Sequence, residues 1–133
     1  MPTIIRKTHE TLVEVRRDVL HAMGWQVRPG VWSPPTDAYE TAQAYIVRVE
    51  AAGMREDDFE VFIQNDTLFV AGTRPDLSAE RRAYHQMEIR FGKFATSVSL
   101  PVAVNVDEAR AEYKDGFLVI TLPKSDPQSR LDT

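Results

Sequence analysis

The side chains that could act as metal ligands in this chain are few and widely spaced. His9, His21 and His85 form no pair at i, i+4 spacing and no HExxH motif, and the sequence contains no cysteine. The carboxylate pair Asp57-Asp58 lacks the glycine-framed spacing of a calcium-binding loop. Because a zinc site needs several histidine or cysteine ligands at short, regular spacings, the sequence predicts no metal site.

Groups for covalent catalysis and phosphate binding are equally sparse. No serine stands in the Gly-x-Ser-x-Gly context of a nucleophile elbow. The six glycines are dispersed along the chain, so they form no phosphate-binding loop. The sequence therefore predicts a protein that is not an enzyme, with no catalytic residues, no cofactor and no use of ATP.

Charge and hydropathy point away from nucleic acid and membranes. A formal net charge of −4 gives no electrostatic reason to bind nucleic acid or an anionic lipid surface. No segment approaches the roughly 20 apolar residues of a membrane-spanning helix. The first residues have no apolar run behind their charges, so we expect no secretory signal and a cytoplasmic protein.

Residues 1–33 predict an N-terminal arm that contains an amphipathic helix and a linker. Thr11 and Glu14 have the spacing of a capping box, and Gly24 stands where the helix would end. A helix this short is marginal alone in water, so its apolar stripe must pack on its own domain, on a sister chain or on another protein. The two tryptophans beside the linker are either hydrophobic staples or exposed apolar contacts. The candidate contacts in this arm are Leu12, Val15, Val19, Leu20, Met23, Trp25 and Trp32.

Apolar residues recur with a period of 3.6 in the arm but with a period of 2 from residue 34 to residue 124. A period of 2 indicates β-strands with one buried face. Asp115-Gly116 stands between two alternating runs, where a type I′ hairpin turn needs positive φ at both central residues. Many short strands without helical pattern between them predict an all-β, antiparallel, immunoglobulin-like sandwich. The polar composition of residues 125–133 predicts a flexible tail.

Residues 73–93 are long for a loop, and loops of such length in compact domains usually have a function. Within this segment, residues 84–89 could form a strand that has no obvious partner in its own chain. A lone strand carries unpaired backbone groups that seek a sheet edge. Pairing with a second chain is the simplest way to satisfy them.

Four stretches in this order carry a resemblance to a known family. An alternating strand and a glycine-containing turn lie at 34–54, and a hairpin follows at 57–74. A strand runs from Gly-x-Phe to Leu-Pro within 91–101, and AEYKDGFL at 111–118 fits the signature Ala, three residues, Asp-Gly, one residue, Leu. Residues 34–124 thus resemble the α-crystallin domain of the small heat shock protein (Hsp20) family.

The resemblance implies an assembly and two kinds of binding surface. In the non-animal branch, a loop strand crosses to the sheet of a partner and forms a homodimer; here the acceptor edge would be near residues 36–40. The crossing residues would be Tyr84, His85, Gln86, Met87 and Glu88. A groove at the sandwich edge, which binds clients or partners in the family, would be lined by Phe59, Val61, Ile63, Ala109 and Ala111, although the same strand pattern also suits simple core residues.

The function implied is that of an ATP-independent chaperone, a holdase that binds partly unfolded proteins and prevents their aggregation under heat or other stress. One rival is a related sandwich of the p23 type, acting as a co-chaperone or interaction scaffold. The loop at 73–93 argues against that rival, because the loop suits strand exchange between subunits. A second rival, an enzyme, lacks any convergent set of nucleophile, base or metal ligands.

Two departures from the family pattern bear on assembly. The tail offers only Leu131 in place of the family's pair of alternate apolar anchors, so we expect dimers or small higher oligomers rather than large particles. The strand before Leu100 commonly carries arginine in the family, whereas this chain has Thr96 and Ser97. A charge pair across the dimer would then be absent or be supplied by Arg82 or Arg90.

Overall fold

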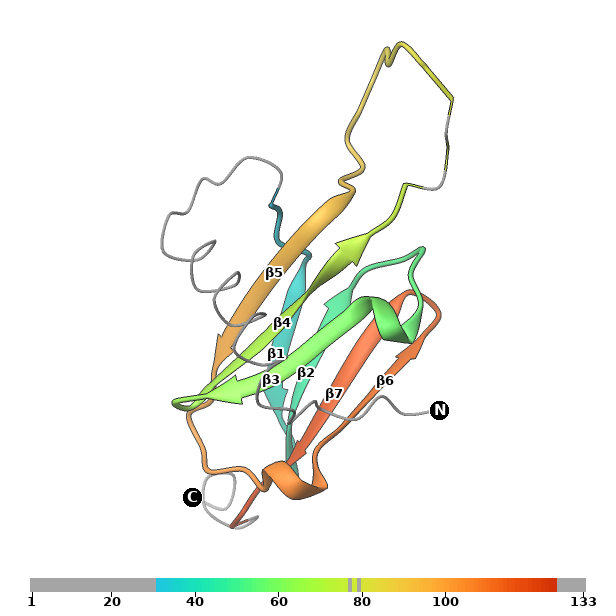
Figure 1. Ribbon diagram of the computed structural model, residues 1–133. Coiled ribbons are helices and arrows are strands. Elements are labelled where there is room, and N and C mark those ends of the chain that lie inside the picture. Colours follow the sequence, from blue (N-terminus) through green and yellow to red (C-terminus); the bar gives the residue numbers. More distant parts are fainter. Residues whose placement is uncertain (1–30, 77, 79, 127–133) are drawn as a thin grey trace.

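The computed structural model describes residues 31–76, 78 and 80–126 (Figure 1). These residues form seven β-strands and two short 3-10 helices, η1 (Glu56–Asp58) and η2 (Val106–Glu108), and none of them lies in an α-helix. The predicted N-terminal helix and most of the predicted tail lie outside the described residues.

The strands form two antiparallel sheets that pack face to face (Figure 1). The four-stranded sheet has the order β1 (Thr36–Glu40), β2 (Ala44–Glu50), β7 (Phe117–Pro123) and β6 (Arg110–Lys114). The three-stranded sheet has the order β3 (Phe59–Gln64), β4 (Thr67–Arg74) and β5 (Gly92–Ser99). The prediction of an all-β, antiparallel, immunoglobulin-like sandwich is confirmed.

The core between the sheets comes from the alternate residues of each strand, because a strand sends successive side chains to opposite faces. Burying each of these large apolar side chains stabilises the fold by about 1.5–3 kcal/mol. Aromatic rings close the core near the loop end, where Phe94 lies 5.5 Å from Trp32 and 5.8 Å from Phe59, between ring centroids. The fully buried aliphatic residues include Val47, Val49, Val61, Leu68, Val70, Leu118, Ile120 and Leu122.

The turn between β6 and β7 has the backbone that its sequence suggests. Asp115 and Gly116 have φ values of 53° and 86°, and a two-residue type I′ turn needs positive φ at both positions. A β-carbon added to Gly116 would lie 3.4 Å from the β-carbon of Ala52. The turn therefore depends on glycine mainly for its left-handed backbone and secondarily for space.

Gly116→Val is expected to lower the free energy of unfolding by more than about 1 kcal/mol, because a β-branched residue is strained at positive φ. Urea unfolding monitored by circular dichroism measures the loss. Asp115→Asn serves as the control, since asparagine tolerates the left-handed region and should leave stability nearly unchanged. An equal loss in both variants would contradict the backbone explanation.

Candidate functional site

The segment between β4 and β5 projects away from the sandwich instead of packing on it (Figure 1). Its described residues from 80 to 91 are all exposed, and none belongs to a strand. Apolar side chains are among them: Tyr84 is 49% exposed, Met87 64% and Ile89 65%. This protruding loop thus holds chain that belongs to no sheet and apolar surface that the described sandwich leaves uncovered.

Arg74, at the end of β4, fixes the base of the protruding loop. Its Nε donates to the carbonyl oxygen of Arg90 at 2.8 Å, and its Nη1 donates to the carbonyl oxygen of Ala52 at 3.4 Å. Its guanidinium carbon lies 4.4 Å from the ring centroid of Trp32 and 5.4 Å from that of Phe91. Arg74 therefore ties both ends of the loop to the sandwich. Sequence reasoning missed it, because each contact joins residues far apart in the chain.

Trp32 is a structural residue in this fold. It is only 8% exposed, and its backbone pairs with β5, donating to the carbonyl oxygen of Lys93 at 3.1 Å and accepting from the amide of Ala95 at 2.9 Å. Its indole Nε1 donates to the carbonyl oxygen of Gly92 at 3.3 Å. These contacts favour the first of the two alternatives left by the sequence, a packing role for Trp32. Trp25 and the helix residues lie outside the described residues.

Within the loop, Arg82 orients Tyr84. Its Nη1 donates to the Tyr84 hydroxyl at 2.9 Å, and its guanidinium lies 5.5 Å from the centre of that ring. Nη2 of Arg82 also lies 3.3 Å from a carboxylate oxygen of Asp76. Exposed pairs of this kind contribute at most about 1 kcal/mol, so they bias the loop conformation without locking it.

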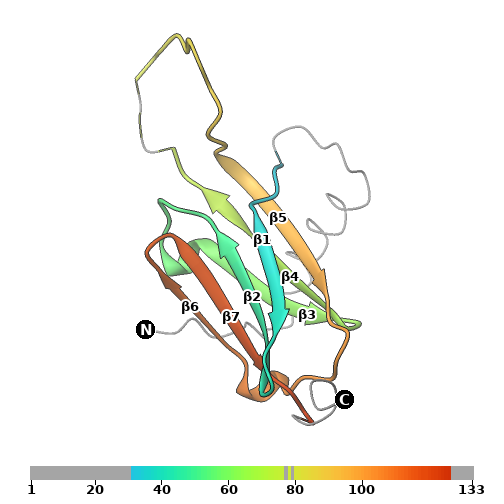
Figure 2. The same ribbon diagram turned by 180° about the vertical axis from the view of Figure 1, so that it is seen from behind.

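β1 lies at the edge of the four-stranded sheet (Figure 2). Side chains on both of its faces hold it in place. Nη2 of Arg48 lies 2.9 Å from Oδ2 of Asp37, and this hydrogen bond raises the pKa of Arg48. Nζ of Lys124, a fully buried side chain, lies 2.9 Å from Oε1 of Glu40. A firmly held edge strand presents a preformed backbone template to an incoming strand.

Thr96 and Ser97 occupy the positions where the family commonly has arginine, and one of them is buried while the other is exposed. Thr96 is 7% exposed, and the hydroxyls of Thr36 and Thr96 lie 3.3 Å apart, which joins β1 to β5 across the sandwich. Ser97 is exposed on the opposite face of β5. These two residues carry no charge, so neither provides a charge pair to a partner.

The five predicted groove residues divide between core and surface. Phe59 and Ala111 are 1% and 0% exposed, and Val61 is 2% exposed, so these three are core residues. Ile63, on the edge strand β3, and Ala109, the residue just before β6, are partly buried and pack against the core. β3 and β6 come into contact where the rings of Phe59 and Tyr113 lie 5.2 Å apart.

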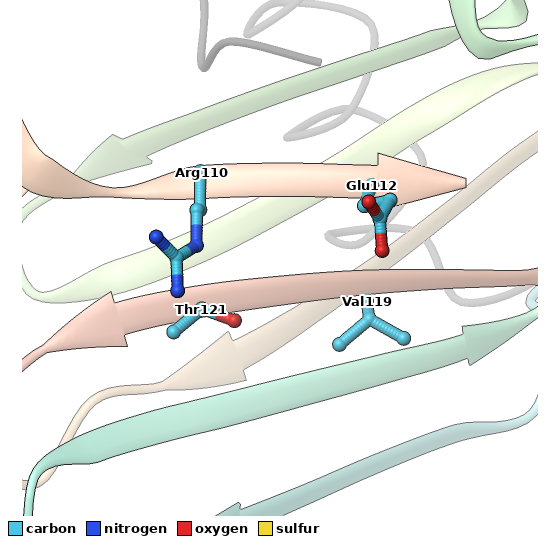
Figure 3. Close-up of a pocket in the computed structure, with 4 residues that line it drawn as sticks. All are labelled: Arg110, Glu112, Val119 and Thr121. Carbon is cyan, nitrogen blue, oxygen red and sulfur yellow. The ribbon is translucent and has the colours of Figure 1, made fainter. Parts of the chain in front are cut away.

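A shallow hollow lies on the outer face of the four-stranded sheet, over β6 and β7 (Figure 3). Arg110, Glu112, Val119 and Thr121 line it. The opposite charges and the valine surface suit weak protein contacts better than bond-breaking chemistry.

Among the described residues, no group of three or more histidine, cysteine or acidic side chains is arranged to hold a metal ion. No helix in the described part of the chain is long and apolar enough to cross a membrane.

A two-sheet antiparallel sandwich with a firmly held edge strand and a long exposed loop before its fifth strand is the architecture of an α-crystallin domain. The chain belongs to the Hsp20/alpha crystallin family, whose pattern residues 37–132 match. Its relatives in this family are small heat shock proteins. The resemblance expected from the sequence is confirmed.

Two curated relatives and one solved structure illustrate the similarity. Small heat shock protein C2 of Rickettsia felis is 36% identical over 94 residues, which cover 70% of this chain and 61% of that protein. Heat shock protein 16 of Schizosaccharomyces pombe is 31% identical over 100 residues, covering 72% and 69%. The hspA structure from Xanthomonas axonopodis superposes with a TM-score of 0.66 at 26% identity, covering 74% of this chain and 98% of that one. The chain spans 57–61% of the length of the first three curated relatives.

Proposed function

We propose that this chain is a holdase, which binds partly unfolded proteins without ATP and prevents their aggregation during heat or other stress. The observation that carries the proposal is the edge of a sandwich from the small heat shock protein family, where β3 is an edge strand and the apolar residues Ile63 and Ala109 are only partly buried. Unfolding proteins expose the same two features, apolar surface and strand edges. A protein that offers matching surface holds them without any covalent chemistry.

The proposed assembly is a homodimer in which the loop strand of each subunit, residues 84–88, pairs with β1 of the other. Three observations support it: the loop backbone belongs to no strand in its own chain, β1 is an edge strand, and side-chain contacts hold β1 in place. In an extended segment His85 and Met87 share one face, and Tyr84, Gln86 and Glu88 share the other. Met87 would supply apolar contact on one side of the exchanged strand, and Tyr84 on the other.

Clients are proposed to bind at two places. Ile63 on β3 and Ala109 just before β6 retain accessible surface, and they are the proposed contacts for an extended apolar segment of a client. The second proposed place is the N-terminal arm, where the sequence pattern puts apolar residues between Leu12 and Met23 on one face of the predicted helix. The compartment expected from the sequence, the cytoplasm, stays a prediction.

The test is light scattering from a heat-labile enzyme warmed with and without this protein, in buffer that contains no ATP. We expect scattering to fall in proportion to added protein and to be nearly abolished near equimolar subunits, because each dimer offers fixed binding surface. An inert globular protein at the same mass concentration is the control. Unchanged aggregation, or protection that requires ATP, would contradict the holdase. A monomer without protective effect would favour the p23-type rival, and turnover of a substrate would favour an enzyme.

A further inference from the structure

The protruding loop leaves the sandwich at the last rung of the β4–β5 ladder, where Arg74 lies opposite Gly92. Gly92 has a φ of 92°, and glycine lets the backbone turn in several directions because it has no β-carbon. The described loop residues from 80 to 91 are all exposed, and Figure 1 shows them standing clear of both sheets. The direction of the loop is therefore set mainly at its base.

The guanidinium of Arg74 contacts three separate segments at this base. Its Nε and Nη2 both donate to the carbonyl oxygen of Arg90, and its Nη1 donates to the carbonyl oxygen of Ala52. The ring centroids of Trp32 and Phe91 lie 4.4 Å and 5.4 Å from its guanidinium carbon. All three side-chain nitrogens of Arg74 are thus used to join the loop to the sandwich.

These contacts depend on the shape of arginine more than on its charge, because the partners are carbonyl oxygens and aromatic rings. The planar guanidinium presents its donors in a fixed fork and stacks on aromatic rings. A lysine ammonium is a compact point charge, which cannot reach both carbonyl oxygens and stack on both rings at once. The base of the loop therefore calls for arginine at position 74.

We propose that Arg74 is a positioning residue for subunit exchange, whose guanidinium fork fixes the direction in which the loop leaves the sandwich. Residues 84–88 are then held ready for β1 of a second subunit. This inference rests on the proposed homodimer. A segment held in its binding direction loses less conformational freedom on association, and a two-fold dimer contains two such loops, so the advantage counts twice.

The first experiment measures the dimer dissociation constant of Arg74→Met and Arg74→Lys by sedimentation velocity over a dilution series. We expect Kd to rise at least about tenfold in both variants, because each loop must be ordered when it binds. The control, Arg110→Met, removes an exposed arginine on the outer face of the other sheet and should leave Kd within about twofold of wild type. A wild-type Kd in Arg74→Met, or in Arg74→Lys, would overturn the proposal.

A second readout separates positioning from simple stabilisation of the sandwich. Nitroxide labels at Arg81→Cys in the loop and Glu108→Cys in η2 occupy exposed positions of a chain that has no cysteine of its own. Pulsed electron resonance then measures their distance distribution in a chain that also carries Met87→Asp and Ile89→Asp, so that the loop is observed without a partner. Adding Arg74→Met should broaden the distribution, and adding Arg110→Met should not. An unchanged width in the Arg74 variant would overturn the proposal.

Failure of this inference is distinguishable from failure of the proposals on which it rests. A wild-type chain that stays monomeric at every concentration would overturn the homodimer and this inference together. A wild-type dimer whose Kd is unchanged in the Arg74 variants would overturn this inference alone. Urea unfolding of the diluted variants shows that the subunits compared are folded, and the light-scattering test of the holdase is independent of both results.

Discussion

Gly72→Ala is expected to destabilise the domain by about 3 kcal/mol, because a single added methyl group has no space at this position. Gly72 lies in β4, the central strand of the three-stranded sheet. A β-carbon there would overlap the carbonyl oxygen of Asp58 and lie 2.7 Å from Cζ of Phe94. The carbonyl belongs to the backbone of η1, and Phe94 is 2% exposed and packed against other rings, so neither neighbour can move cheaply.

Urea unfolding followed by tryptophan fluorescence and circular dichroism measures this loss as a lower midpoint with an unchanged slope. Gly53→Ala is the matched control, since Gly53 has φ of 77° but no atom within 4 Å of an added β-carbon. The control should lose about 1–2 kcal/mol through backbone strain alone. A loss at Gly72 no larger than that at Gly53 would contradict the steric account.

The strands were predictable because the period of apolar residues is a local property that tertiary contacts reinforce. Val47 and Val49 alternate with polar neighbours, and both point into the core as the pattern requires. The same rule places Phe62 on the outward face of β3, but it does not predict that Phe62 is buried there with Phe69, Ala71 and Ala95. Only the register shows that these four apolar residues lie together.

The candidate site was predictable only in part, because its contacts are long-range. The alternating pattern of residues 84–89 in a long loop is visible in the sequence, and the structure leaves these residues outside both sheets. Their pairing as a strand with a second chain stays a prediction. The Arg74 clamp on Trp32 and Phe91 could not be predicted, because nothing in the local sequence distinguishes Arg74 from other arginines. The groove residues were ambiguous for a related reason: alternation fixes which face a residue occupies but not how near it lies to an edge.

Met87→Asp combined with Ile89→Asp is expected to convert the proposed dimer into a folded monomer. These two side chains share one face of an extended segment, and they are 64% and 65% exposed in the single chain. The described part of the chain leaves them uncovered, and the proposed partner would bury them. Losing about 1.5–3 kcal/mol for each weakens association by at least about 100-fold, at roughly 1.4 kcal/mol per tenfold change in Kd.

Sedimentation velocity over a dilution series measures the change in subunit mass, and thermal unfolding shows whether the monomer is folded. Arg81→Asp, an exposed substitution in the same loop, is the control and should leave the mass unchanged. Because Met87 and Ile89 are exposed in the single chain, the double variant should unfold at the temperature of a wild-type sample diluted to monomer. A double variant that keeps the dimer mass would show that the loop does not form the interface. A variant that loses the dimer together with its fold would show that these side chains stabilise the sandwich itself, which their exposure in the single chain argues against.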